Sequence, residues 1–201
     1  SQNMPNVSVA GTNVQMWVTM TIIRNSVVVV LIMLLATASS VIMLKWLWLS
    51  LLVLVLDQAS KLLVDASLQL YEAIPLMPSF NLTYARNTGA AFSFLSDAGG
   101  WQRWLFAGLA VLMSGFIAGW LKKLGDHETW MAAALSMVLG GAIGNLIDRV
   151  AYGYVIDFLD IYYQDWHWPA FNIADSAICI GVAIMLLDSF RAEPSSPFKK
   201  S

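Results

Sequence analysis

KWLWLSLLVLVLDQASKLL, residues 45–63, decides the fold, because this stretch is long and apolar enough to cross a lipid bilayer. Three further stretches of similar length and hydrophobicity lie at roughly 102–121, 129–148 and 171–190. Of the 201 residues, 58% are hydrophobic and only 12% are charged, whereas a soluble domain is about 25% charged. The sequence therefore predicts an all-α membrane protein, a single domain built as a bundle of four transmembrane helices.

Basic residues near the ends of the predicted spans orient the bundle. In a four-span arrangement they fall mainly on one side of the membrane: Lys45, Lys122, Lys123, Arg191, Lys199 and Lys200. This side is predicted to be cytoplasmic, since cytoplasmic span ends carry an excess of Lys and Arg. The links 64–101 and 149–170 then face outward. In the first link Phe80, Leu82 and Tyr84 alternate with other residues, which predicts a small antiparallel sheet on the membrane surface.

The composition argues against several classes of function. The net charge is −2 and the positive charges are scattered, so no nucleic-acid partner is expected. The single cysteine, Cys179, cannot form an internal disulfide, and its apolar surroundings in the sequence predict a small core residue. The isolated histidines His127 and His167 form no cluster with metal-ligand spacing. Neither a metal nor a cofactor is expected.

Polar residues gather at the outward ends of the predicted spans. Asp57 and Lys61 are four residues apart and share a helix face; they form either an interfacial ion pair or a polar patch beneath a site. Asn145 requires a hydrogen-bond partner inside the bundle. Asn172 and Asp175 lie at the start of the fourth span, where the helix dipole favours a negative charge. A capping role for Asp175 is therefore an alternative to a catalytic one.

A second group of acids lies at the end of the third span and in the link that follows it. Asp148, Asp157 and Asp160 are close in sequence, and spacing alone leaves open which of them meets Asp175. Together with Arg149 these groups converge on one membrane face, which predicts a site near the outer leaflet. Two adjacent carboxylates can share one proton and activate water for peptide hydrolysis. A small ion-coupled transporter or channel subunit is the alternative, because intramembrane Asp and Asn residues also suit cation paths.

Five motifs in this order resemble the bacterial lipoprotein signal peptidases (signal peptidase II): DQASK (57–61), NTGAAFSFL (87–95), GGAIGNLIDR (140–149), VIDF (155–158) and FNIADS (171–176). The resemblance covers about 43–190. It implies four spans with both termini in the cytoplasm and a small extracytoplasmic β-sheet cradle. It also implies an intramembrane aspartyl endopeptidase of the bacterial inner membrane. The implied partners are membrane lipid and diacylglyceryl-modified prolipoproteins, cleaved on the amino side of the modified cysteine.

The resemblance also implies roles for individual residues. Asp157 and Asp175 match the family's catalytic pair, so the resemblance selects Asp157 over Asp148 and Asp160. The supporting and substrate-binding positions of the family match the following residues of this chain: Asp57, Lys61, Asn87, Gly89, Asn145, Arg149 and Asn172.

The segment before the first span departs from the family pattern. We expect an N-terminal extension at 1–42, a peptidase domain at 43–190 and a cytoplasmic tail at 191–201. The run VVVVLIMLL (27–35) precedes small residues and is similar to a secretory signal. An additional span and a natural start at Met43 are the other interpretations, and we favour the start at Met43.

Overall fold

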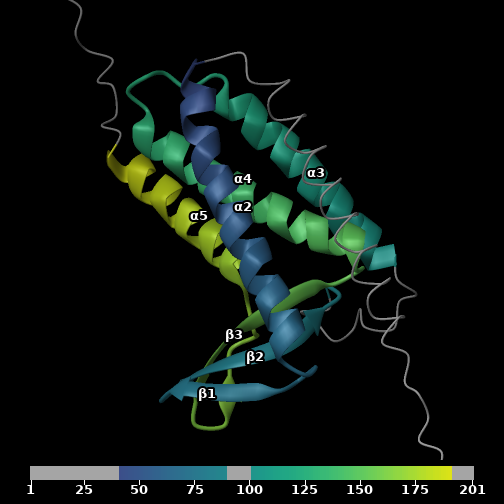
Figure 1. Cartoon of the computed structure of the whole chain (residues 1–201). Coiled ribbons are helices and arrows are strands. Elements are labelled where there is room, and N and C mark those ends of the chain that lie inside the picture. The colour runs from purple at the N-terminus through teal and green to yellow at the C-terminus, as the bar shows by residue number, and fades with distance from the viewer. Residues whose placement is uncertain (1–40, 90–100, 192–201) are drawn as a thin grey trace, which may run out of the picture.

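The computed structural model describes residues 41–89 and 101–191, which form four long helices with a small sheet at one end (Figure 1). The helices are α2 (Val41–Ser67), α3 (Trp101–Leu121), α4 (Thr129–Ala151) and α5 (Ile173–Arg191). Each is long and apolar enough to cross a membrane, which confirms the four predicted spans. The interpretations of residues 1–40 and of the tail from 192 onward fall outside the described residues.

Helix α4 lies at the centre of the bundle and packs against α2, α3 and α5. Its close approach to two neighbours depends on glycine. A Cβ atom at Gly140 would lie 2.6 Å from the Ser50 carbonyl oxygen of α2, and one at Gly141 would overlap the Ala174 carbonyl oxygen of α5. Small residues of this kind let membrane helices approach closely. The apolar core of the bundle is formed by residues of three helices: Leu54, Ile117, Leu121, Leu135, Leu139, Ile143 and Ile147.

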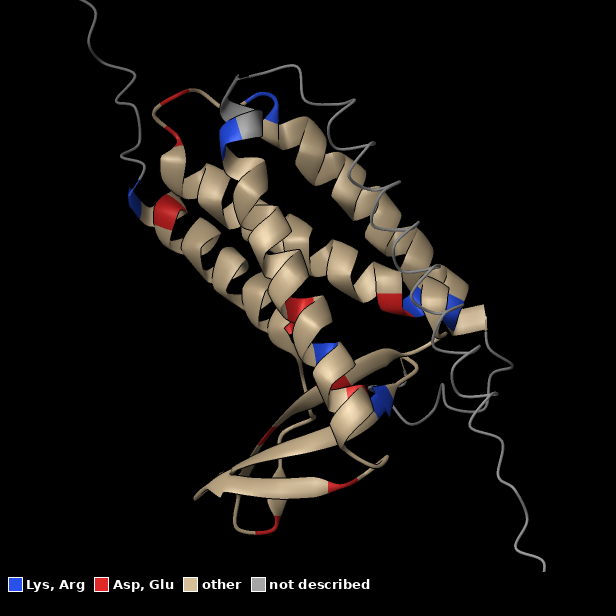
Figure 2. Ribbon diagram, in the orientation of Figure 1, with Lys and Arg blue, Asp and Glu red and all other residues tan. Residues whose placement is uncertain are grey.

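The outer surfaces of the helices are apolar. Large side chains such as Leu112 and Phe116 on α3 and Leu187 on α5 are exposed, as expected where lipid replaces water. Figure 2 shows that most charged residues lie near the helix ends or in the sheet. Cys179 is exposed on α5, so its prediction as a core residue was wrong. Within the bundle, α5 packs mainly against α4, and an apolar sequence does not distinguish a core position from a lipid-facing one.

The sheet has four strands: β1 (Ala73–Met77), β2 (Phe80–Asn87), β3 (Val155–Tyr163) and β4 (Trp166–His167). They lie in the order β1-β2-β3-β4, and each neighbouring pair is antiparallel. The sheet predicted in the first outer link is therefore confirmed, but half of its strands come from the second link, where none was predicted. Val64 and Leu68 at the end of α2 pack against Tyr84, Ile156 and Phe158, which fixes the sheet to the bundle.

Candidate active site

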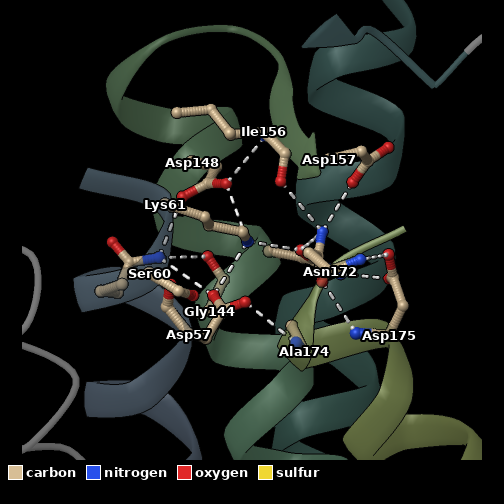
Figure 3. A network of polar contacts seen from close by, with 12 residues as sticks. Asp57, Ser60, Lys61, Gly144, Asp148, Ile156, Asp157, Asn172, Ala174 and Asp175 are labelled. Carbon is tan, nitrogen blue, oxygen red and sulfur yellow. Dashed lines mark hydrogen bonds and ion pairs between the residues drawn. The ribbon is translucent and has the colours of Figure 1, made fainter. Parts of the chain in front are cut away.

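Asn172 joins the two aspartates that the family resemblance selected (Figure 3). This fully buried residue precedes α5, and its Nδ2 donates a hydrogen bond to Asp157 Oδ1 at 2.7 Å. Its Oδ1 accepts the backbone N–H of Asp175 at 2.9 Å, while its own backbone N–H donates to Asp175 Oδ2 at 3.3 Å. This reciprocal pairing has the form of a capping box. Asp175 therefore caps the helix and faces the site at the same time.

Asn145 of α4 holds Asp175 from a second side. Its Nδ2 donates to Asp175 Oδ1 at 2.8 Å, and its Oδ1 accepts a hydrogen bond from Lys61 Nζ at 2.9 Å. The predicted internal hydrogen-bond partners of this buried amide are thus present. Because both Asp175 oxygens have donors, the carboxylate has a fixed orientation at the N-terminus of α5.

Asp157 lies on β3 and is only 2% exposed. In addition to Asn172, it accepts a hydrogen bond from Asn87 Nδ2 of β2 at 3.0 Å. Asn87 is itself oriented by the backbone N–H of Gly89, which donates to Asn87 Oδ1 at 2.8 Å. Gly89 has a φ of 94°, a conformation that favours glycine. The structure therefore places two residues of the NTG motif, Asn87 and Gly89, in support of Asp157.

Burial, followed by the negative charge of Asp175, raises the pKa of Asp157 to about 7. The hydrogen bonds from Asn87 and Asn172 favour the ionised form and oppose this rise. Burial outweighs them because a carboxylate loses most of its hydration when it is enclosed. Asp157 is thus suited to hold a proton near neutral pH.

The two other acids that were candidate partners of Asp175 have different contacts. Asp160 accepts a hydrogen bond from Asn81 Nδ2 at 2.8 Å and lies 2.9 Å from His167 Nδ1. Asp148 forms an ion pair with Lys61. The structure thus brings Asp157, rather than either of its neighbours, to Asn172.

A buried charge cluster lies beneath the two aspartates. Lys61 Nζ is 2.8 Å from Asp57 Oδ2 and 2.9 Å from Asp148 Oδ2. With the hydrogen bond to Asn145, each of the three ammonium N–H groups has an acceptor. The side chains of Lys61, Asp57 and Asp148 are 2%, 0% and 1% exposed, so the pair of Asp57 and Lys61 is internal and not interfacial. Asp57 Oδ1 also accepts the N–H of Ala174, which ties the cluster to α5.

The sequence motifs predict no role in this cluster for two of its residues. Asp148 is predicted only as a possible partner of Asp175, and no role is predicted for Gln58. Gln58 Nε2 donates to Asp148 Oδ1 at 2.9 Å and lies 3.2 Å from Asp57 Oδ2, so it links the two carboxylates. The sequence offered one signal for these two residues, namely Lys61. A lysine inside a predicted membrane span needs more than one acceptor for its charge.

Arg149 extends from the last turns of α4 beside the site. Its Nη1 donates to the Asn145 carbonyl at 3.0 Å, and its guanidinium stacks on the Phe106 ring at 5.5 Å. Within the described residues it forms no ion pair, although its charge interacts with both Asp157 and Asp175. The Arg149 guanidinium is therefore placed to offset negative charge at the site without forming an ion pair with either carboxylate.

Comparisons with known proteins identify the family of the chain. A profile of the family described as signal peptidase (SPase) II matches residues 49–191. A lipoprotein signal peptidase of Pseudoalteromonas translucida (strain TAC 125) is 55% identical over 154 residues, 77% of this chain and 93% of the relative. One of Shewanella halifaxensis (strain HAW-EB4) is 56% identical over 146 residues, 73% of this chain and 86% of the relative.

A solved bacterial membrane enzyme, determined by the in meso method, has a similar fold. Its TM-score is 0.68 at 27% identity, and the match covers 78% of this chain and 94% of the enzyme. None of these matches supports the transporter alternative. The profile covers α2 from Leu49 onward, the other three helices, the whole sheet and both aspartates. On these grounds the chain belongs to the signal peptidase II family of membrane peptidases.

Proposed function

We propose that this peptidase uses Asp157 and Asp175 as an aspartyl pair. In this proposal it removes signal peptides from prolipoproteins in the bacterial inner membrane and cleaves on the amino side of a diacylglyceryl-modified cysteine. The observation that carries the proposal is the bridge from Asn172 to both carboxylates, one of which is almost completely buried. The lipoprotein signal peptidases named among the relatives support the class of substrate.

The environments of the two carboxylates suggest different roles. Asp175 is half-buried, accepts two hydrogen bonds and lies at the N-terminus of α5, where the helix dipole interacts favourably with a negative charge. Asp157 is almost fully buried, and its pKa is raised to about 7. In the resting enzyme Asp157 therefore holds the proton, and Asp175 is the base.

The reaction then follows from this asymmetry. Ionised Asp175 takes a proton from a water molecule, whose oxygen attacks the scissile carbonyl carbon. Protonated Asp157 donates a hydrogen bond to the carbonyl oxygen and stabilises its developing negative charge. Collapse of the tetrahedral intermediate breaks the C–N bond, and the leaving amine takes the proton that Asp175 removed from water, so that Asp175 is ionised again. Asn145, Asn172 and Asn87 keep both carboxylates in place throughout.

The charge distribution supports a periplasmic location for the site. Lys122 and Lys123 follow α3 at the end of the bundle opposite to the sheet (Figures 1 and 2). Since positive charges favour the cytoplasmic side, the sheet and the aspartates then face the periplasm. If the acyl chains of a substrate remain in the outer leaflet, its scissile bond would lie at the level of the two carboxylates.

The substrate class is tested with a purified prolipoprotein in two forms, one carrying a diacylglyceryl group on its cysteine and one with that cysteine unmodified. We expect cleavage of the modified form alone, with the modified cysteine as the new N-terminus in mass spectrometry. Equal cleavage of both forms would exclude lipid recognition, and cleavage of neither would contradict the proposed peptidase activity.

The pH dependence of cleavage tests the assignment of the proton to Asp157. Activity should fall as the pH rises through about 7, because Asp157 loses the proton that it needs. The Asn87→Ala substitution removes a hydrogen bond that favours the ionised form, so the pKa of Asp157 rises further. We expect the alkaline limb of the kcat/KM profile to move to higher pH in this variant.

Asn81→Ala is the matched control for this experiment. Asn81 lies on the same strand and donates to Asp160 instead of Asp157. Its removal should leave the alkaline limb in place. A limb that is unchanged in Asn87→Ala, or that moves to lower pH, would mean that a group other than Asp157 limits the reaction at high pH.

A further inference from the structure

Helix α3 carries none of the five sequence motifs, yet its first two turns contact the site. Phe106 is half-buried in this part of the helix and lies beside Gly89, two residues after the end of β2. A Cβ atom at Gly89 would overlap Cε2 of the Phe106 ring and lie 2.6 Å from its Cδ2. The ring therefore occupies the space into which a side chain at Gly89 would extend.

The contact with Gly89 leads directly to Asp157. The backbone N–H of Gly89 donates to Asn87 Oδ1 at 2.8 Å, and Asn87 Nδ2 donates to Asp157 Oδ2 at 3.0 Å. Because the Phe106 ring packs against Gly89, it limits how far the backbone after β2 can move. The orientation of Asn87, and with it the hydrogen bond to Asp157, thus depends on a side chain of α3.

The same ring also supports Arg149. The Arg149 guanidinium lies over Phe106 at 5.5 Å from the ring centroid, where the face of an aromatic ring attracts a cation. The charge of Arg149 interacts with both Asp157 and Asp175. Phe106 therefore contacts both the turn that orients Asn87 and the guanidinium that offsets the negative charge of the site.

Arg103 fixes the position of this part of α3. It is three residues before Phe106 and on the same side of the helix. Its Nε donates to the Arg149 carbonyl oxygen at 2.6 Å, and its Nη2 donates to the Val150 carbonyl oxygen at 2.7 Å. These carbonyls belong to the last turn of α4, where a positive charge also interacts favourably with the helix dipole. Arg103 thus joins the first turn of α3 to the turn of α4 that carries Arg149.

We propose that Phe106 is a positioning residue of the peptidase, which acts on the Asp157 carboxylate through Asn87 and Arg149. The ring has no group that can donate or accept a proton in the reaction, so its effect on cleavage comes from the placement of these two neighbours. This role rests on the proposed function, because it requires that Asp157 takes part in catalysis. It gives α3 a part in the site in addition to its packing against α4.

Replacement of Phe106 by Leu tests this role. Leucine remains apolar but lacks the ring face on which Arg149 stacks and the Cε2 atom that packs against Gly89. We expect kcat to fall by about 10- to 100-fold with little change in KM, because the substrate still binds while the carboxylate is misplaced. Phe116→Leu is the matched control, since Phe116 lies on the same helix, is 61% exposed and packs against Trp120. Both constants should stay close to those of the unmodified protein in this control.

The pH profile separates positioning from a general loss of structure. The charged groups that surround Asp157 come from α2, α4 and α5, and Phe106→Leu removes none of them: Lys61, Arg149 and Asp175. Displacement of the two positioned neighbours would still make the ionised form of Asp157 less favourable. The alkaline limb of the kcat/KM profile should therefore move to higher pH, as expected for Asn87→Ala. A limb that moves in Asn87→Ala but stays in place in Phe106→Leu would overturn the positioning role and leave the proposed function intact.

A second substitution tests the contact between Phe106 and Gly89. Gly89→Ala places a Cβ atom against the ring, so we expect a larger loss of kcat than in Phe106→Leu. In Gly89→Ala/Phe106→Leu the overlapping ring atom is absent, and part of the lost kcat should return. The recovery is incomplete, because the φ of 94° at this position strains alanine in both variants.

A double variant that is no faster than Gly89→Ala would overturn the proposal. This comparison does not use the pH profile, so it decides the proposal even if the limb of Asn87→Ala stays in place and the assignment of the proton to Asp157 fails. The thermal unfolding midpoints of the same variants provide a measurement without substrate. If Gly89→Ala lowers the midpoint and Phe106→Leu restores none of this loss, the contact is absent and the proposal is wrong.

Discussion

Replacement of either Asp157 or Asp175 by Asn is expected to slow cleavage of a lipid-modified prolipoprotein by about 10³-fold. Asparagine has nearly the same shape as aspartate, so the surrounding helices and strands should keep their packing. It cannot take a proton from water, as proposed for Asp175, and it cannot exchange the proton assigned to Asp157. The rate of product formation on a gel, at saturating and at limiting substrate, measures the loss.

The double variant gives a sharper result. If the two carboxylates act as one unit, then Asp157→Asn combined with Asp175→Asn should be no slower than either single variant. Independent roles would instead multiply the two losses. Thermal unfolding of each variant in detergent confirms that the loss of rate does not come from loss of fold.

Asp160→Asn is the matched control, because Asp160 is on the same strand and three residues from Asp157. Its partners are Asn81 and His167, not Asn172. We expect this variant to process substrate at a rate close to that of the unmodified protein, because Asp160, although only 7% exposed, lies outside the hydrogen bonds that hold Asp157 and Asp175. Processing that survives both Asp157→Asn and Asp175→Asn would contradict the aspartyl mechanism.

The helices could be predicted because lipid imposes a simple condition on sequence. A span requires about 20 apolar residues, and four such stretches are visible by composition alone. The sheet was harder to predict. VIDFLDIYY (155–163) combines buried apolar residues with Asp157 and Asp160, so it lacks a clean alternation of polar and apolar positions. Its partner β2 lies about 70 residues away, and pairing over such a distance leaves no local signal.

The charge cluster, too, could be predicted only in part from the sequence. Asp57 and Lys61 share one helix, so their four-residue spacing is visible in the sequence. Asp148 reaches them only because α2 and α4 pack closely at Gly144, where a Cβ atom would lie 2.5 Å from Asp57 Oδ2. This contact depends on the packing of two helices that are distant in sequence, and no spacing rule within one helix reports it.

Substitution of Lys61 by Met is expected to destabilise the protein by about 3–5 kcal/mol. Methionine fills a similar volume but leaves Asp57 and Asp148 buried without their cation. Asn145 Oδ1 also loses its 2.9 Å hydrogen bond to the ammonium group. For a chain of this size, each kcal/mol shifts the unfolding midpoint by about 2–4 °C, so thermal unfolding in detergent should show a decrease of about 10 °C.

A second substitution separates the charge effect from a packing effect. Neutralising one of the two stranded carboxylates in Lys61→Met/Asp148→Asn should recover part of the lost stability, because one buried charge costs less than two. Lys123→Met, at an exposed position after α3, should leave the midpoint within about 2 °C. If the double variant were less stable than Lys61→Met alone, loss of packing and not the unpaired charge would be the main cause of the destabilisation. A midpoint unchanged in Lys61→Met would show that the buried carboxylates take up protons at little cost, so that the ammonium group orients Asn145 without stabilising the fold.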